Sequence, residues 1–221
     1  MRFLDSPGDP GSLIDISVVV SASTPEWPGD TPWSCRWTWE VARGDSVNVS
    51  STTGSPHVGT HADAPFHVDP GWPASDALPL DSFTGPSTVV DVSGQSGALT
   101  LESLGLLSGH VAGGRLLLRT GRSIAGAPFP DQWPWIAEDA LGELLARGLR
   151  LLGVDAPSVD PRESTSLSVH RVLFQGGACI LENLDLRQAM PGDYHLTAFP
   201  LRLAGLDAAP VRAVLRRLAP A

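Results

Sequence analysis

Lysine is absent from this chain of 221 residues, because all 15 of its Lys and Arg residues are arginine. This absence excludes enzymes that form a Schiff base through a lysine, and it excludes proteins that bind phosphates with a P-loop lysine. Positive charge is also scarce, since 24 acidic residues outnumber the arginines and give a net charge of −9. Clustered basic residues are what nucleic acids require, so we expect no nucleic-acid partner.

Cysteine and long apolar segments are scarce as well. The two cysteines, Cys35 and Cys179, are too few for a disulfide scaffold or a cysteine-rich zinc site, and we expect two buried thiols. The first residues lack the basic and apolar regions of a signal peptide, and no apolar run approaches the ~20 residues needed to cross a bilayer. We therefore expect a soluble, cytoplasmic protein without a membrane partner.

The composition predicts one folded domain over residues 1–221. Hydrophobic residues make up 42% of the chain and charged residues 18%, which is typical of a packed core rather than of disorder. Strand and helix patterns mix along the chain, so we expect an α/β fold with a mixed β-sheet core and flanking helices. The predicted strands cover residues 13–20, 33–39, 47–49, 87–92, 116–119, 151–154, 178–181 and 196–203, and the predicted helices cover residues 100–107, 136–147, 168–174 and 208–218.

Tryptophan recurs with a period of two in one of these predicted strands. Trp33, Trp37 and Trp39 fall on the same face as Cys35, because alternate residues of a strand point to one side. We expect these tryptophans to lie in the core or in a subunit interface rather than to contact a ligand.

Three of the six histidines lie within eleven residues, His57, His61 and His67. Their spacing with Asp63 is H-x3-H-x-D-x3-H. Imidazole and carboxylate groups are good ligands for zinc and similar divalent ions. Gly59 allows the backbone to bend between the first two histidines, and Asp63 points the same way as His61 in an extended chain. The spacing alone therefore favours a metal site.

This segment resembles the signature of the cyclase family of metal-dependent hydrolases, to which bacterial kynurenine formamidases belong. The residues that carry the resemblance are His57-x-Gly59-Thr60-His61-x-Asp63-Ala64-Pro65-x-His67. Residues 27–32 are similar to the N-terminal substrate loop of that family, most like that of the kynurenine formamidases. Residues 153–160, followed by His170 and Glu182, are similar to its C-terminal metal segment. The resemblance covers residues 12–205 and implies the cyclase-like swivelling β/β/α fold.

The resemblance implies a site with two divalent metal ions, zinc or alternatively manganese, held by His57, His61, Asp63, His170 and Glu182. Asp63 would bridge the two ions, and Glu182 would touch both. His67 would be the catalytic proton shuttle rather than a permanent ligand. Trp27 would stack on the aromatic ring of the substrate, although a tryptophan at this position could also anchor a loop on the core.

The implied reaction is the hydrolysis of N-formyl-L-kynurenine to L-kynurenine and formate in tryptophan degradation, by a homodimer. A metal-activated hydroxide would attack the formyl carbon of this small aromatic formamide, and His67 would carry a proton to the leaving arylamine. Within the family, another amide, a cyclic amide such as isatin, or a lactone is an alternative substrate. Outside it, the alternatives are a metal-binding protein without turnover and a nonmetal hydrolase, although the sequence has no G-x-S-x-G motif.

Overall fold

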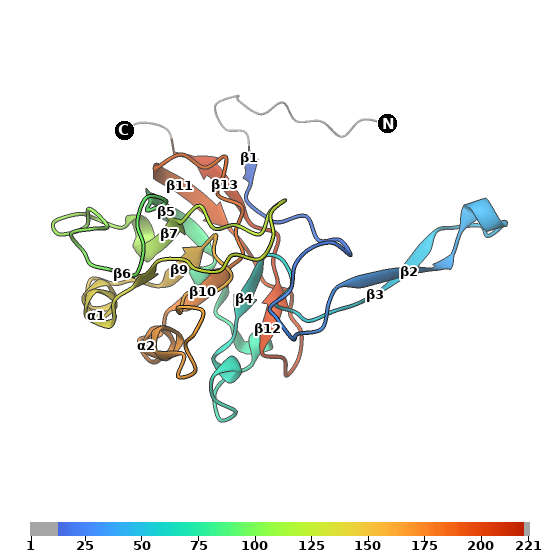
Figure 1. Ribbon diagram of the computed structural model, residues 1–221, viewed down its shortest axis with the longest axis horizontal. Coiled ribbons are helices and arrows are strands. Elements are labelled where there is room, and N and C mark those ends of the chain that lie inside the picture. Colours follow the sequence, from blue (N-terminus) through green and yellow to red (C-terminus); the bar gives the residue numbers. More distant parts are fainter. Residues whose placement is uncertain (1–12, 219–221) are drawn as a thin grey trace.

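The computed structural model describes residues 13–218 and places nine strands in one mixed sheet (Figure 1). The order across the sheet is β1 (Leu13–Asp15), β13 (Val214–Arg217), β11 (Gly192–Thr197), β5 (Thr84–Asp91), β7 (Arg115–Arg119), β9 (Leu151–Val154), β10 (Cys179–Glu182), β4 (His61–Asp63) and β12 (Ala208–Pro210). Two small sheets pair β2 (Ser34–Trp39) with β3 (Val49–Thr53) and β6 (Ala98–Leu99) with β8 (Trp135–Ile136).

The centre of the large sheet is parallel and its two sides are antiparallel. Strands β5, β7, β9 and β10 run in one direction, whereas β4 and β12 on one side and β11, β13 and β1 on the other pair antiparallel. All residues of β9 and β10 are buried. Near-continuous apolar strands of this kind require cover on both faces of the sheet. The predicted mixed sheet with flanking helices is therefore confirmed.

Alternation along β7 divides the core between the two faces. Leu116 and Leu118 belong to a cluster that includes Leu141 and Leu173, which lie on the two α-helices. Leu117, between them, belongs to a second cluster with residues of β11, β13 and β10. Successive side chains of a strand point to opposite faces, so one short sequence of leucines contributes to both layers.

Two α-helices lie beside β9 and β10, α1 (Glu138–Ala146) and α2 (Ser168–Gln175) (Figure 1). Both fall inside the predicted ranges or within one residue of them. Glu138 and Asp139 occupy the first turn of α1, where negative charge stabilises the helix dipole. No helix among residues 13–218 is long and apolar enough to cross a membrane.

The predicted helix over residues 208–218 is wrong, because this segment forms strands β12 and β13. Alanine, leucine and arginine favour a helix in isolation, but tertiary pairing overrides that propensity. Ala208, Ala209 and Leu215 are fully buried within the sheet. Pro210 lies in the last strand of the sheet order, and proline without its N–H group is tolerated on such an edge.

Four other predicted elements differ from the structure, among them the strand over residues 47–49, of which only Val49 lies in a strand. Residues 100–107 form turns instead of a helix, in which Thr100 and Ser103 hydrogen-bond to each other and Gly105 adopts a positive φ of 69°. The predicted strand over residues 196–203 begins earlier and ends at Thr197, three residues before Pro200. At the N-terminal end, only residues 13–15 of the predicted strand over residues 13–20 form one.

Strands β2 and β3 form a hairpin that projects from the body of the molecule (Figure 1). Every residue of β2 is exposed, including Cys35, so the expectation of two buried thiols holds only for Cys179. Trp37 and Trp39 are 54% and 53% exposed, which excludes them from the core of this chain. The subunit interface that the sequence also suggested for them stays a prediction.

Candidate metal centre

The backbone of the site is a pair of neighbouring antiparallel strands, β4 and β10. His61 and Asp63 are two residues apart on β4, so their side chains point to the same face. Glu182, the last residue of β10, lies directly opposite His61 in the ladder. All three side chains are at least 95% buried. The sheet register therefore brings Glu182 beside His61 and Asp63, although it lies 119 residues after Asp63 in the chain.

His57 joins them through a tight turn that requires glycine. Gly59 has φ +77°, and a Cβ atom there would lie 2.4 Å from Cγ2 of Val20. The turn brings Nδ1 of His57 to 3.1 Å from Nε2 of His61. The carbonyl oxygen of Gly59 accepts a hydrogen bond from Nδ1 of His61 at 2.9 Å, which leaves Nε2 of His61 facing the other side chains.

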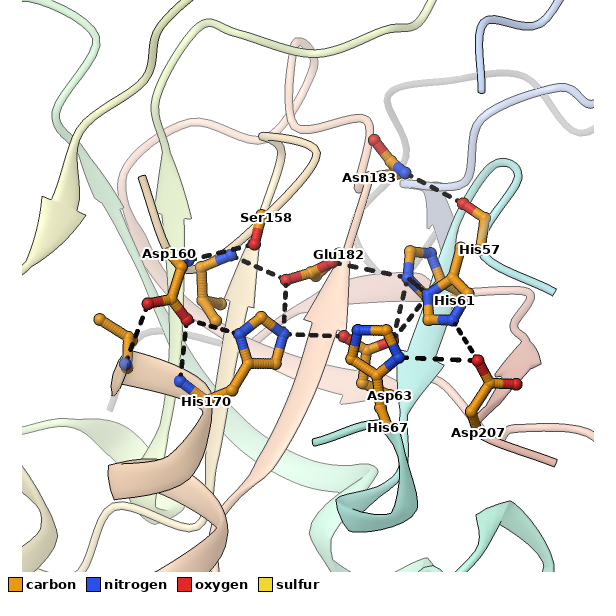
Figure 2. Close-up of polar contacts among 12 residues, drawn as sticks. His57, His61, Asp63, His67, Ser158, Asp160, His170, Glu182, Asn183 and Asp207 are labelled. Carbon is orange, nitrogen blue, oxygen red and sulfur yellow. Dashed lines mark hydrogen bonds and ion pairs between the residues drawn. The ribbon is translucent and has the colours of Figure 1, made fainter. Parts of the chain in front are cut away.

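His170 enters from helix α2 and is oriented by Asp160 (Figure 2). Its Nδ1 atom lies 2.6 Å from Oδ2 of Asp160, which also accepts the His170 backbone N–H. Its Nε2 atom lies 3.0 Å from Oδ2 of Asp63 and 3.3 Å from Oε1 of Glu182. Because a carboxylate can only accept, Nδ1 donates to Asp160, and Nε2 is the ring nitrogen that faces Asp63 and Glu182.

The donor atoms form two sets with the spacing that a metal ion requires. In the first set, Nδ1 of His57 and Nε2 of His61 each lie 3.1 Å from Oδ1 of Asp63. The second set is Nε2 of His170 with Oδ2 of Asp63 and Oε1 of Glu182. The ligand atoms of tetrahedral zinc, about 2.0–2.1 Å from the ion, lie roughly 3.3–3.4 Å apart. The distances from Asp63 to the two histidines of the first set, 3.1 Å each, and from His170 to the two acids of the second, 3.0 and 3.3 Å, are close to that value.

Asp63 shows why a cation fits here. Its Oδ1 atom is buried and has no hydrogen-bond partner of acceptable geometry among the described residues, although two imidazole nitrogens lie 3.1 Å away. An unpaired buried carboxylate oxygen is costly, and a bound cation would satisfy it. Glu182 also offers one oxygen to each side, since Oε2 lies 3.5 Å from Nε2 of His61. The residues therefore fit a divalent cation, for which Asp63 and Glu182 would supply carboxylate oxygens.

His67 lies at the rim of the same cluster. It ends the short 3-10 turn Pro65–His67 that follows β4, and its side chain is 30% exposed. One ring nitrogen lies 3.6 Å from Oδ2 of Asp207, and the other faces His170 and Asp63 (Figure 2). Donor atoms of His57, Asp63 and His67 come within 4.8 Å of one another. His67 therefore lies close enough to the other donor atoms to share a metal ion with His57 and Asp63.

The charges of the acids set the pKa values of the imidazoles. Burial lowers the pKa of His57, but the charge of Asp63 and the hydrogen bond to Asp207 outweigh it and raise the pKa to about 10. Burial also lowers the pKa of His61, but the charge of Asp63 outweighs it and raises the pKa to about 9. The hydrogen bond to His57 lowers the pKa of Asp207 to about 2.

A cavity of about 340 Å³ opens onto these side chains. Trp27 lines this cavity, and the residue is 39% exposed. The centroid of its ring lies 5.5 Å from that of Phe129 and 6.0 Å from that of Trp133, both in edge-to-face contacts. Asp30 lines the cavity as well, and its backbone N–H donates to the carbonyl of Trp27 within one turn. The cavity thus has an aromatic wall on one side and the histidines and acids on the other.

The structure brings together all seven residues that the sequence singled out, and it adds three more. Asp160 and Asp207 lie behind His170 and His57, and Asn183 follows Glu182 with a left-handed φ of 54°. Asp160 is the last residue of the segment 153–160 that carries part of the family resemblance, so a signal for it exists. Asp207 has no comparable signal, because 150 residues separate it from His57.

The comparisons with known proteins place the chain in a family. Residues 14–161 match the Cyclase family model, described as "Putative cyclase". A kynurenine formamidase from Salinibacter ruber is 46% identical over 212 residues, which cover 93% of this chain and 97% of that protein. A structure named "predicted metal-dependent hydrolase from Bacillus stearothermophilus" is 27% identical with a TM-score of 0.78, over 94% of this chain and 98% of that one.

Isatin hydrolase A from Ralstonia solanacearum shares the fold, with a TM-score of 0.79 at 22% identity over 92% of this chain and 91% of that one. The family model and the 46% identity over nearly the whole chain confirm the resemblance carried by residues 57–67. This chain therefore belongs to the cyclase family of metal-dependent hydrolases.

Proposed function

We propose that this chain hydrolyses N-formyl-L-kynurenine to L-kynurenine and formate, as a step of tryptophan degradation. The observation that carries the proposal is the 46% identity to a kynurenine formamidase over 93% of the chain. A cavity that is lined by aromatic side chains, beside His, Asp and Glu side chains that could hold a metal ion, supports it. An aryl formamide suits this cavity, because its ring needs an apolar wall and its amide needs a hydrolytic centre.

The proposed cofactors are two zinc ions, with manganese as the alternative. His57, His61 and Asp63 would hold one ion, and Asp63, Glu182 and His170 would hold the other. When bound, a divalent ion lowers the pKa of water to about 7 and so makes hydroxide available at neutral pH, and it polarises a carbonyl oxygen. Asp63 and Glu182 balance the positive charge, and Asp160 keeps His170 in the orientation that binds.

The other roles belong to side chains of the cavity. Trp27 stacks on the aromatic ring of the substrate and holds the formamide toward the histidines. His67 takes a proton from the attacking water and passes it to the arylamine nitrogen as the C–N bond breaks, because an arylamine anion is a poor leaving group and histidine transfers protons readily near neutral pH. The products are the neutral amine and formate.

The same proposal includes the oligomeric state of the protein and its location in the cell. The entire chain, residues 1–221, acts as one domain, and two copies form a homodimer in the cytoplasm. The exposed tryptophans of the β2–β3 hairpin support a subunit contact, because a two-stranded hairpin alone is marginally stable in water. Sedimentation of the purified protein tests the dimer, which a monomer at micromolar concentration would contradict.

An absorbance assay with formylkynurenine and, in parallel, isatin tests the function. We expect a higher kcat/KM for formylkynurenine, loss of activity with a chelator, and recovery when zinc is added. Faster turnover of isatin would instead favour a cyclic amide as the substrate. Activity that survives complete removal of metal, checked by elemental analysis, would contradict the metal-dependent mechanism.

A further inference from the structure

Each of the three histidines proposed to bind metal has a hydrogen-bond acceptor at its other ring nitrogen. The carbonyl of Gly59 serves His61, and the carboxylate of Asp160 serves His170. For His57 the acceptor is Asp207, whose Oδ2 atom lies 2.9 Å from Nε2 (Figure 2). A carboxylate only accepts, so the His57 ring must place its N–H at Nε2 and turn Nδ1 toward Asp63.

Asp207 also reaches the residue proposed to move the proton. The same Oδ2 atom lies 3.6 Å from Nδ1 of His67, within ion-pair range although too long for a hydrogen bond. The rings of His57 and His67 lie side by side, with centroids 4.6 Å apart and their planes tilted by 47°. One carboxylate oxygen therefore lies beside both rings.

The fold holds Asp207 firmly in this place. Its carbonyl oxygen accepts the backbone N–H of Ala64 at 2.8 Å, and the next residue, Ala208, pairs with Asp63 where β12 joins β4. Asp207 is thus held directly before β12 and beside Ala64, the residue that follows β4. Its side chain remains 40% exposed, so it faces the site from the solvent side.

We propose that Asp207 is a positioning residue, which orients His57 for metal binding and His67 for proton transfer through one carboxylate oxygen. The His67 half of this proposal rests on the proposed hydrolysis of formylkynurenine, whereas the His57 half concerns metal binding alone. Partners that orient metal-binding histidines typically contribute about 10–100-fold in metal affinity or activity.

The test compares Asp207→Ala, Asp207→Asn and a matched control, Asp76→Asn. Asp76 accepts the backbone N–H of Gly205 in the adjacent loop and contacts none of the histidines described here. Zinc affinity is measured without substrate, by competition with a chromophoric chelator. We expect Asp207→Ala to weaken zinc binding by about 10–100-fold, Asp207→Asn to lose less because its amide oxygen can still accept, and Asp76→Asn to bind like the wild type.

The second measurement is kcat and KM for formylkynurenine at saturating zinc. We expect Asp207→Ala to lower kcat by about 10–100-fold with little change in KM, because the orientation of His67 matters for turnover and not for substrate binding. Unchanged zinc affinity in Asp207→Ala would overturn the His57 half, and unchanged kcat would overturn the His67 half. An equal loss of zinc affinity in Asp76→Asn and Asp207→Asn would show a structural effect of the loop and overturn both.

The two measurements also separate this inference from the proposed function. If the wild-type protein binds zinc but does not hydrolyse formylkynurenine, the proposed substrate fails. Weaker zinc binding by Asp207→Ala would then still support the role of Asp207 toward His57.

Discussion

Nε2 of His170 lies 3.0 Å from Oδ2 of Asp63, although 107 residues separate the two in the chain. The other oxygen of Asp63 faces His57 and His61, so this one carboxylate lies between both sets of donor atoms. Helix α2 supplies the histidine, and β4 supplies the acid. The centre of the proposed site is therefore assembled by the fold and not by a local motif alone.

Replacing Asp63 with alanine should remove metal as well as activity, because both sets of donor atoms lose an oxygen. Elemental analysis of the purified variant and the formylkynurenine assay measure the two effects. Asp131→Ala is a suitable control, since the Asp131 side chain is 97% exposed and lies outside the cavity. Unchanged metal content in Asp63→Ala would contradict the bridging role.

Replacing His67 with alanine should leave metal content intact but slow turnover by about 10²–10⁴-fold, the usual contribution of a general acid–base residue. The measurement is kcat with formylkynurenine in protein of known zinc content. His110, which is exposed and remote in sequence from the motif, provides the control His110→Ala. Full activity of His67→Ala would remove His67 from the mechanism, and loss of metal would make it a ligand.

Replacing Trp27 with alanine should mainly raise KM, because stacking on the substrate ring is present in the ground state and the transition state alike. Trp27→Phe retains an aromatic face beside Phe129 and should show a smaller rise. Steady-state kinetics of both variants measure whether KM rises more in Trp27→Ala than in Trp27→Phe. A fall in kcat at unchanged KM would indicate that Trp27 acts on the reacting amide instead.

Zinc binding at pH 7 should release protons. In the metal-free protein the pKa values of His57 and His61 are raised to about 10 and about 9, so both imidazoles carry a proton that a metal ion must displace. Titration calorimetry in two buffers of different ionisation enthalpy measures the release. Identical apparent enthalpies in both buffers would show that the imidazoles are already neutral.

The metal-free protein should also lose stability in alkaline solution. The unfolded pKa of histidine is near 6.5, and His57 and His61 titrate higher in the folded state, so their contribution is fully present below pH 6.5. It is lost as the pH rises through 9 and 10. Thermal unfolding of chelator-treated protein at pH 7 and pH 10 measures the effect, and His57→Gln should reduce the difference. An equal melting temperature at both pH values would contradict these pKa values.

The sequence predicted the parts of the site that are local. His61 and Asp63 share a face because strand alternation operates over two residues, and the bend at Gly59 follows from the freedom of glycine. The prediction that His170 and Glu182 join the site depended on the family resemblance, since neither residue has a signal of its own.

Asp207 could not be predicted, because its place depends on sheet pairing. The composition of residues 208–218 favours a helix, and a helix gives no reason to bring Asp207 beside β4. The structure pairs β12 with β4 instead, through buried alanines and an edge proline. Long-range strand pairing leaves little trace in a single sequence, which is why this end of the sheet and its carboxylate were missed together.

The close approach of Gly59 to Val20 couples two parts of the molecule that have different tasks. Val20 begins the loop that leads to Trp27, while Gly59 sets the separation of His57 and His61. A single methyl group added at Gly59 would push the two segments apart. We therefore expect Gly59→Ala to displace both the proposed metal ligands and the loop that carries Trp27. Metal affinity and substrate preference should then change together.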